Sequence, residues 1–395
     1  MDRSRRFQKS SIAAILCAAC AFALEFPGGT DLPIRLKTKV STQTAKPGDP
    51  VEAVVIGGPL MGAIVRGTVG KSVKSSKGDE RSALTLNFAE LESGAKKIKI
   101  EARLAEVENA REQVDAEGVI QGILATETIT GKIDQGINRV AERYSGLAGV
   151  LGGIKGAVFK AAESDVAYDA GVEMALRLTE PLAVEPPAGP KLEPIADTAA
   201  LEKLIAAEPF QTVAESPPKP SDITNLLLVG TEEQVRKTFA EAGWFTAAEL
   251  SAQSKFETVK AIGENRGYNE APVSILLLDG KPPDLVFQKS TNTFAKRHHL
   301  RVWKRAATWQ GRPVWSVAAT HDIGISFSER NRTFIHLIDG KIDRERTKVA
   351  EDLVFTGKVQ SSVLVDRPHV PKKSENATGD ALETDGKIAV LVLAP

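Results

Sequence analysis

The distribution of proline divides this chain into two parts. Eight of its 21 prolines fall between Pro186 and Pro220, in stretches such as PPAGPKLEP and ESPPKPSD. Proline has no backbone N–H and favours extended chain, so such a stretch does not extend a regular sheet or helix. We therefore predict a linker at residues 185–222, interrupted by a short helix at about 197–207. The full length of 395 residues leaves room for a domain on each side.

Residues 1–23 have the pattern of a secretory signal peptide. A basic start precedes the apolar run SIAAILCAACAFA, which is short for a membrane span. AFA at residues 21–23 matches an A-x-A cleavage site, and both cysteines, Cys17 and Cys20, precede it. We expect export to the periplasm or cell envelope, and a mature chain without cysteine and without a spanning helix. A lipoprotein anchored at Cys20 is the alternative.

Short runs of alternating apolar and polar residues characterise residues 24–184. In LPIRLKTKV, from Leu32 to Val40, the alternation has the period of a half-buried strand. Many such runs with Gly, Pro and Ser turns between them predict a small β-barrel or sandwich. The expected strands lie at 32–40, 51–56, 63–73, 82–91, 96–107 and 169–184.

A glycine-rich segment interrupts this first domain at residues 118–165. Its centre, GLAGVLGGIKGAVFKAA, has small residues four positions apart, a spacing that lets two helices approach closely. Lys155 and Lys160 break the apolar run, so it is too short to span a bilayer. We expect an inserted α-hairpin that packs on the barrel. The alternative is a hairpin in contact with a membrane.

Residues 223–395 mix strand and helix patterns. ITNLLLVG at residues 223–230 predicts a buried strand, and Thr231 with Gln234 forms the capping box of the helix that follows. A second helix is expected at 246–262, and a closing helix at IDRERTKVAEDLVF. A mixed sheet covered by a few helices accounts for this pattern, so the whole chain is predicted to be α+β, with the barrel first.

Five motifs follow one another between about residues 225 and 356: LLLVGTEEQVRKTFAEAGW, DLVFQK, RHHLRVW, GRPVWSVAATHDIGIS and HLIDGKIDRER. Together they resemble the LssY C-terminal domain family. The resemblance implies an envelope setting, because related domains follow membrane segments, and it implies no defined activity. At the last motif the chain departs from the family pattern, with His336-Leu337 where relatives have two histidines. The first domain resembles barrel modules of exported bacterial proteins more loosely.

Four of the five histidines and three of the four tryptophans lie between Asp284 and Arg346. If RHHLRVW is a strand, His299 lies on one face and His298 on the other, with Leu300 and Val302. Trp303 and Trp315 are expected in the core, and Trp309 in a loop where it can stack on a ligand. A candidate site joins three strands, each of which supplies one imidazole, with a carboxylate beside them: His299, His321, His336, and Asp322 or Asp343.

A basic segment offers a second candidate site. Between Phe294 and Arg312 there are six Lys and Arg residues and no acid. Arg297 and Arg301, together with His299, are placed to clamp a phosphate or carboxylate. On the closing helix, Asp343 and Arg346 are expected to pair or to anchor the helix to the strand arginines, and Asp339 is expected to cap its N-terminus. The binding residues predicted from both sites are Arg297, His298, His299, Arg301, His321, Asp322, His336, Asp343 and Arg346.

Two functions follow from these patterns. The first is an exported, non-enzymatic protein whose second domain binds an anionic small molecule, a lipid headgroup or another envelope protein. The alternative is a hydrolase of the phosphoester class, with or without a metal, that uses His299, His321 and His336. The spacings match no metal motif such as H-E-x-x-H, so no metal or other cofactor is predicted. Lysine and arginine total 51, as do aspartate and glutamate, which argues against nucleic acid as a partner.

Overall fold

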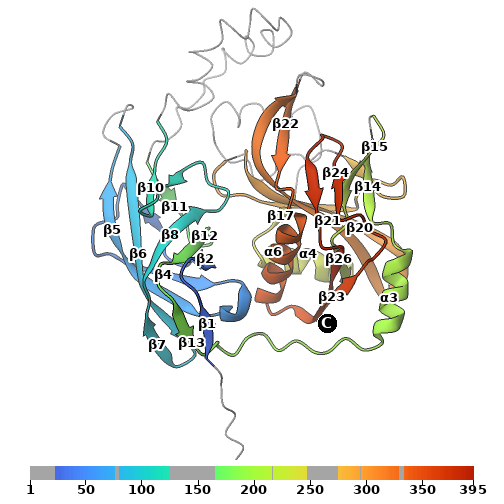
Figure 1. Ribbon diagram of the computed structural model, residues 1–395, viewed down its shortest axis with the longest axis horizontal. Helices are drawn as coiled ribbons and strands as arrows, with labels where there is room; N and C mark the ends of the chain where they lie inside the picture. The colour runs from blue at the N-terminus through green and yellow to red at the C-terminus, as the bar shows by residue number, and fades with distance from the viewer. Residues whose placement is uncertain are drawn as a thin grey trace, which may run out of the picture.

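The computed structural model describes residues 23–75, 80–124, 165–215, 217–246, 275–293, 295–328 and 333–395. These residues are mostly β, with 48% in strands and 13% in helices. They form two units that lie side by side (Figure 1). We call residues 23–184 the barrel unit and residues 207–395 the C-terminal unit. The signal-peptide prediction concerns residues that lie almost entirely outside the described ranges.

The barrel unit is built on a nine-stranded, nearly closed sheet with the order β8-β12-β2-β4-β5-β6-β10-β9, in which β7 also pairs with β6. Alternate residues point inward, as the sequence predicted: Ile34 and Leu36 of β2 and Leu84 and Leu86 of β6 are fully buried. Its strands are β1 (Leu24–Phe26), β2 (Asp31–Leu36), β3 (Val40–Ser41), β4 (Pro50–Val55), β5 (Ile64–Val73), β6 (Ala83–Ser93), β7 (Lys96–Lys99), β8 (Ala102–Val107), β9 (Gln113–Val114), β10 (Val119–Gln121), β11 (Ala167–Tyr168), β12 (Glu173–Leu178) and β13 (Leu182–Val184).

The predicted start of the helical insert is wrong. Residues 119–121 form β10, which pairs with β6 and β9 in the sheet. A turn precedes this strand, where Gly118 has a φ of +86° and Asp115 Oδ1 accepts from the N–H of Val119 at 2.9 Å. Aspartate and glycine favour such turns, and the chain therefore re-enters the sheet. Residues 125–164, the rest of the expected α-hairpin, lie outside the described residues. The expected strand 96–107 is likewise divided, into β7 and β8.

The C-terminal unit contains an eight-stranded sheet with the order β17-β19-β20-β21-β16-β26-β23, in which β22 pairs with β21. The β16–β26 pair is parallel, and the other pairs of this sheet are antiparallel. Its strands are β16 (Leu226–Val229), β17 (Phe245–Thr246), β19 (Leu285–Lys289), β20 (Arg297–Trp309), β21 (Arg312–Ser328), β22 (Thr333–Ile338), β23 (Val359–Asp366) and β26 (Lys387–Leu393). Smaller sheets contain β14 (Gln211–Ala214), β15 (Lys219–Ile223) and β18 (Leu276–Leu277), and β24 (Lys373–Glu375) with β25 (Ala381–Glu383).

Helices cover both faces of this sheet. On the face toward the barrel unit, α4 (Glu232–Glu241) and α6 (Ile342–Phe355) pack on Leu300, Val302 and Trp315 (Figure 1). On the other face, α3 (Thr198–Ala207) packs against β16 and β26. The predicted capping box of α4 is present, because Thr231 and Gln234 exchange side-chain and backbone hydrogen bonds. Thr246, the first residue of the helix expected at 246–262, ends β17, and the rest of that helix lies outside the described part of the chain.

The predicted linker is shorter than expected at its C-terminal end. The short helix within it is confirmed as α3, but residues 211–223 pair as β14 and β15 rather than running as extended linker. Pro220 fits this arrangement because β15 is the edge strand of its sheet, where a missing N–H leaves no gap in the ladder.

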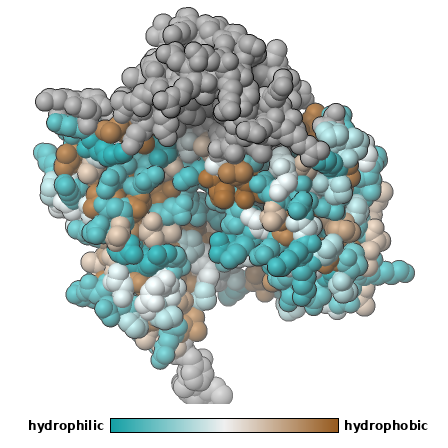
Figure 2. Space-filling model, turned by 45° about the horizontal axis from the view of Figure 1, so that its top comes forward, coloured by the Kyte–Doolittle hydropathy of each residue, from teal (hydrophilic) through white to brown (hydrophobic). Residues whose placement is uncertain are grey.

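Charged side chains dominate the interface between the units. Arg35 of β2 and Glu173 of β12 meet Lys289, Lys348 and Asp352 of the C-terminal unit. The coloured surface in Figure 2 is mostly hydrophilic, with hydrophobic patches among the hydrophilic areas. Among the described residues, no helix has the length and apolar character that a membrane crossing requires.

Candidate metal centre

Two histidines lie opposite each other on the face of the sheet that α6 covers. His298 of β20 and His321 of β21 are cross-strand partners, and their rings stack with centroids 4.3 Å apart and planes 26° apart. Glu345 is in the first turn of α6, which crosses this end of the strands. Its Oε2 lies 2.8 Å from His298 Nδ1. The sheet register and the helix together thus place two imidazoles and one carboxylate in contact.

The barrel unit closes this cluster from the other side. Directly after β8, Glu108 places Oε2 3.4 Å from His298 Nε2, and Asn109 places Oδ1 2.8 Å from His321 Nε2. Asn109 has a φ of +52°, a left-handed conformation that asparagine adopts more readily than most residues. This tight turn directs two consecutive polar side chains across the interface.

We call His298, His321 and Glu345 the interface site. One ligand atom from each lies within 4.8 Å of the other two. Glu345 Oε1 is buried and has no hydrogen-bond partner among the residues that the structure describes. A cavity of about 200 Å³ adjoins the three side chains. Its lining consists of Glu108, His298, His321, Asp339, Arg344, Glu345 and Lys348.

The surroundings favour positive charge at this point. Burial opposes a charge on the His298 imidazole, but the carboxylates of Glu345 and Glu108 outweigh burial and raise its pKa to about 10. Burial, reinforced by the neighbouring charge on His298, lowers the pKa of His321 to about 4. Burial would raise the pKa of Glu345, yet His298 holds it below the usual range. His298 therefore carries the positive charge of the cluster, between the carboxylates of Glu345 and Glu108, and His321 is neutral. An ion that binds here would replace the His298 proton.

Two imidazoles and one carboxylate form a ligand set that suits a divalent transition metal. Zinc in catalytic sites takes three protein ligands, His₂Glu among them, at about 2.0–2.2 Å, with a fourth position left open. Imidazole is a poor ligand for Mg²⁺ and Ca²⁺, which prefer oxygen. The interface site therefore fits a zinc-like ion. Sequence spacing alone predicted no metal site, and this geometry does not support that prediction.

The predicted convergence of His299, His321 and His336 is wrong. Asp322 Oδ2 lies 3.4 Å from His299 Nδ1 and 3.2 Å from His336 Nδ1, on the opposite side of the sheet from His321. Thr320 Oγ1 lies 2.8 Å from His299 Nε2, and all of this second cluster except His336 is buried. Burial would raise the pKa of Asp322, but His299, His336 and Arg297 keep it far below its usual value. Strand alternation separates neighbouring residues such as His321 and Asp322, so the imidazoles belong to two clusters.

The predicted arginine clamp is also wrong. Arg301 is 2% exposed and donates to Asp222 Oδ2 at 3.1 Å. Arg297 is 4% exposed and donates to Asp322 Oδ2 at 2.9 Å and to Gln288 Oε1 at 3.0 Å. Both guanidinium groups are thus engaged inside the C-terminal unit, where an anion from solvent does not reach them.

The predictions for the closing helix and for Trp309 have mixed outcomes. Arg346 pairs with Asp343 at 3.0 Å, as expected, and also with Asp385 at 2.7 Å, which ties α6 to the segment before β26. Asp339 does not cap α6: it accepts from the N–H of Lys341, while the helix begins at Ile342. Trp309 is 6% exposed and belongs to the core on the α3 side, so it is not available for stacking on a ligand.

The sequence analysis missed Glu108, Asn109 and Glu345. Strand alternation did separate His298 from His299, and the face that it assigned to His298 is the one that carries the site. The missing signal is the pairing of β20 with β21, which sets His298 opposite His321. Glu108 and His298 are 190 residues apart, so no local spacing connects them.

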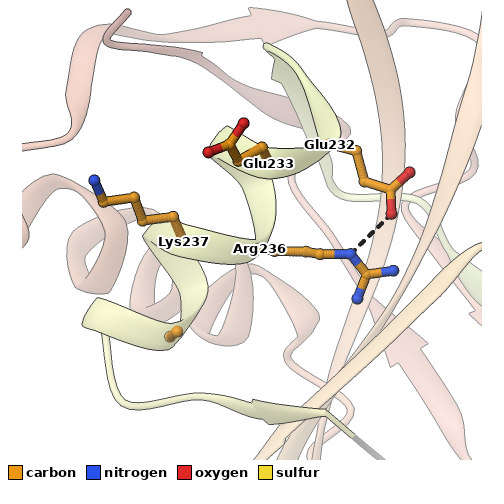
Figure 3. A pocket seen from close by; sticks show the side chains of 5 residues that line it. Glu232, Glu233, Arg236 and Lys237 are labelled. Carbon is orange, nitrogen blue, oxygen red and sulfur yellow. Dashed lines mark hydrogen bonds and ion pairs between the residues drawn. The ribbon is translucent and has the colours of Figure 1, made fainter.

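A second hollow, of about 530 Å³, lies over the exposed side of α4 and has no comparable chemistry. Five residues of that helix line it: Glu232, Glu233, Arg236, Lys237 and Ala240. Arg236 donates to Glu232 at 2.8 Å, and Glu233 and Lys237 point away from that pair (Figure 3). Because their polar groups do not converge, this surface offers no site.

A family model described as the LssY C-terminus matches residues 207–388. This part of the chain is an LssY C-terminal domain. The match includes all three residues of the interface site and excludes Glu108 and Asn109, which belong to the barrel unit. No curated protein matches the chain.

Proposed function

We propose that this chain binds one divalent transition-metal ion through His298, His321 and Glu345 of its LssY C-terminal domain. The observation that carries the proposal is the convergence of three ligand atoms within 4.8 Å of one another at the wall of a cavity. The buried Oε1 of Glu345 supports it, because an unpaired carboxylate oxygen is costly to bury and a cation relieves that cost.

Metal-assisted hydrolysis of an anionic phosphoester is the reaction that such a site favours. A zinc-like ion with an open position activates water and polarises a phosphoryl oxygen. Arg344 lines the same cavity, and its side chain is 68% exposed. It is therefore placed to attract an anionic group that the buried Arg297 and Arg301 do not reach. This version retains the hydrolase hypothesis but moves it from the His299 and His336 side of the sheet to the interface site.

A non-enzymatic binding module is the second candidate, and the size of the cavity favours it. Pockets for small-molecule ligands usually measure about 300–1,000 Å³. The cavity at the interface site has about 200 Å³, enough for an ion and a few waters but small for a substrate. In this version the ion links β20, β21 and α6 of the C-terminal unit, and the partner binds elsewhere.

Metal stoichiometry tests the site itself. The chain is stripped with a chelator, reloaded with Zn²⁺, freed of unbound ion, and its metal is counted by elemental analysis. We expect one ion per chain in the wild type and in the control His369→Ala, because His369 is exposed and its ring meets Phe210 edge-on. His321→Ala and the nearly isosteric Glu345→Gln should lose the ion. Equal loading of all four proteins would refute the proposal.

Hydrolysis separates the two candidates. The zinc-loaded and zinc-free forms are compared for release of nitrophenol from p-nitrophenyl phosphate and for thermal unfolding. Catalysis predicts activity only in the loaded form, with a higher KM in Arg344→Ala. A binding module predicts no activity in either form and a lower Tm without zinc. Activity that persists after the ion is removed would exclude the metal-dependent reaction.

Export to the periplasm or envelope is a further part of the proposal, supported by the basic and apolar residues 1–23. Mature protein beginning at Leu24 would agree with it, and intact Met1 in the purified cellular protein would contradict it. The proposal also includes an envelope protein or a lipid headgroup as the partner. It further includes an α+β classification of the C-terminal unit and an α-hairpin within residues 125–164.

A further inference from the structure

The barrel unit contacts one side of both imidazoles in the interface site. Asn109 Oδ1 lies 2.8 Å from His321 Nε2, and Glu108 Oε2 lies 3.4 Å from His298 Nε2. An amide oxygen and a carboxylate only accept hydrogen bonds, so each Nε2 must carry the proton. Glu108 and Asn109 are adjacent in one loop, and each places an acceptor oxygen against the Nε2 of one of the two stacked rings.

The consequence falls on the other nitrogen of each ring. With a proton on Nε2, Nδ1 is the nitrogen that is left to bind an ion. At His298 the ion would take the place of a second proton, because the ring without an ion donates from Nδ1 to Glu345 Oε2. His298 Nδ1 is the atom that lies 2.8 Å from Glu345 Oε2, the carboxylate of the proposed site. Histidines that bind metals usually donate their second N–H to a carboxylate or carbonyl, which fixes the ring and increases the basicity of the ligand atom.

The loop that carries Glu108 and Asn109 is itself held by the C-terminal unit. Thr291 Oγ1 donates to the backbone oxygen of Glu108 at 2.6 Å, and Asn292 Oδ1 accepts from the N–H of Arg111 at 2.9 Å. Asn292 Nδ2 also donates to Glu112 Oε2 at 2.7 Å. These bonds come from the segment between β19 and β20, directly before His298. The hydrogen bonds that dock the two units therefore also hold the loop that orients the imidazoles.

We propose that Glu108 and Asn109 are positioning residues: the barrel unit selects the Nε2–H tautomer of His298 and His321, so that both Nδ1 atoms face the ion. The inference rests on the proposed metal site and adds a division of labour to it. The LssY C-terminal domain supplies the ligands, and a unit outside that domain sets their orientation. High affinity for the ion then requires both units in their docked positions.

The test measures Zn²⁺ affinity by competition with a chromophoric chelator in the full-length protein. Glu108→Gln removes the charge at His298. Asn109→Gly removes the acceptor at His321 and suits the positive φ without strain. Loss of such an outer partner typically weakens metal binding by about 10–100-fold, and we expect each variant to fall in that range. The control Glu101→Gln changes a barrel-unit carboxylate that is 56% exposed and pairs with Lys99, and it should bind Zn²⁺ as the wild type does.

Tautomers give a readout that a merely structural role would not change. Long-range ¹H–¹⁵N spectra of the zinc-loaded wild type should show Nδ1 as the bound nitrogen and Nε2 as the protonated one in both histidines. Asn109→Gly should lose this pattern at His321, and Asn109→Asp, which keeps an acceptor, should restore it. Unchanged affinity and spectra in Glu108→Gln and Asn109→Gly would overturn the inference and leave the metal site standing. A wild type that binds no zinc would overturn the metal site, and the inference with it.

Discussion

At the scale of single residues, alternation along the strands predicted which side chains share a face. His298 with Leu300 and Val302, and Trp303 and Trp315 as core residues, agree with the structure. Alternation does not reveal what packs against a face. Arg297 and Arg301 occur in a basic segment that reads as solvated, but Asp322 and Asp222 neutralise them within the core. A carboxylate 79 positions away along the chain is invisible to a local pattern.

Replacement of Arg301 tests this correction. Arg301→Met should lower the free energy of unfolding by about 3–5 kcal/mol, because it leaves the buried Asp222 without its cation. Zinc and phosphate binding should not change. Unfolding in urea provides the measurement, with Arg236→Met as the control, since that exposed i,i+4 pair contributes about 0.3–0.5 kcal/mol. A stable Arg301→Met variant with weakened phosphate binding would contradict this correction and support the predicted arginine clamp.

At the scale of elements, prediction succeeded where one periodicity ran without interruption and failed at its ends. β4, β5, β6 and the helices α3, α4 and α6 lie close to their expected positions. The errors occur where a turn or an edge changes the pairing. Examples are the turn at Asp115 and Gly118 that starts β10, and the edge position that admits Pro220 into β15. Where β10 begins and whether β15 accepts a proline depend on the neighbouring strands rather than on the local sequence.

The contact between β12 and α6 depends on a buried network of charges. Glu173 Oε1 accepts from Arg35 at 2.7 Å and from Lys289 at 2.8 Å, and its Oε2 forms an ion pair with Lys348 at 2.6 Å. The same three cations reach Asp352 at 3.4, 2.8 and 2.7 Å. Burial would raise the pKa of Glu173, but Lys348, Lys289 and Arg35 hold it well below its usual value. Stabilisation from Glu173 is therefore present above its unfolded pKa and is lost as pH falls through the lower folded value.

Glu173→Gln should thus destabilise the protein by about 3–5 kcal/mol at neutral pH, because three cations lose a shared partner at the interface. Chemical unfolding of the variant and the wild type from pH 7 to pH 3 measures this difference, which should narrow at the acidic end. The exposed Glu180→Gln serves as the control and should match the wild type. A difference that does not change with pH would contradict the assignment of a lowered pKa to Glu173.

At the scale of the whole molecule, the interface site lies in one unit and its outer contacts come from the other. The LssY C-terminal domain contributes His298, His321 and Glu345, while the barrel unit contributes Glu108 and Asn109. Composition predicted two parts joined by a proline-rich segment, and the structure has one large sheet on each side of that segment. The sequence contains no signal for how the parts dock, because docking depends on charges from β2, β12 and α6 that are distant along the chain. Glu108 and Asn109 were missed for that reason, because the histidines that they contact belong to the other unit.

X-ray absorption at the zinc edge of the reloaded wild-type protein tests the metal site most directly. We predict a first shell of two imidazole nitrogens and one carboxylate oxygen, with a fourth light ligand, all at about 2.0–2.2 Å. Any zinc that remains on His321→Ala should show at most one imidazole, because His298 is still present. A wild-type spectrum of oxygen ligands only, without imidazole, would contradict the account.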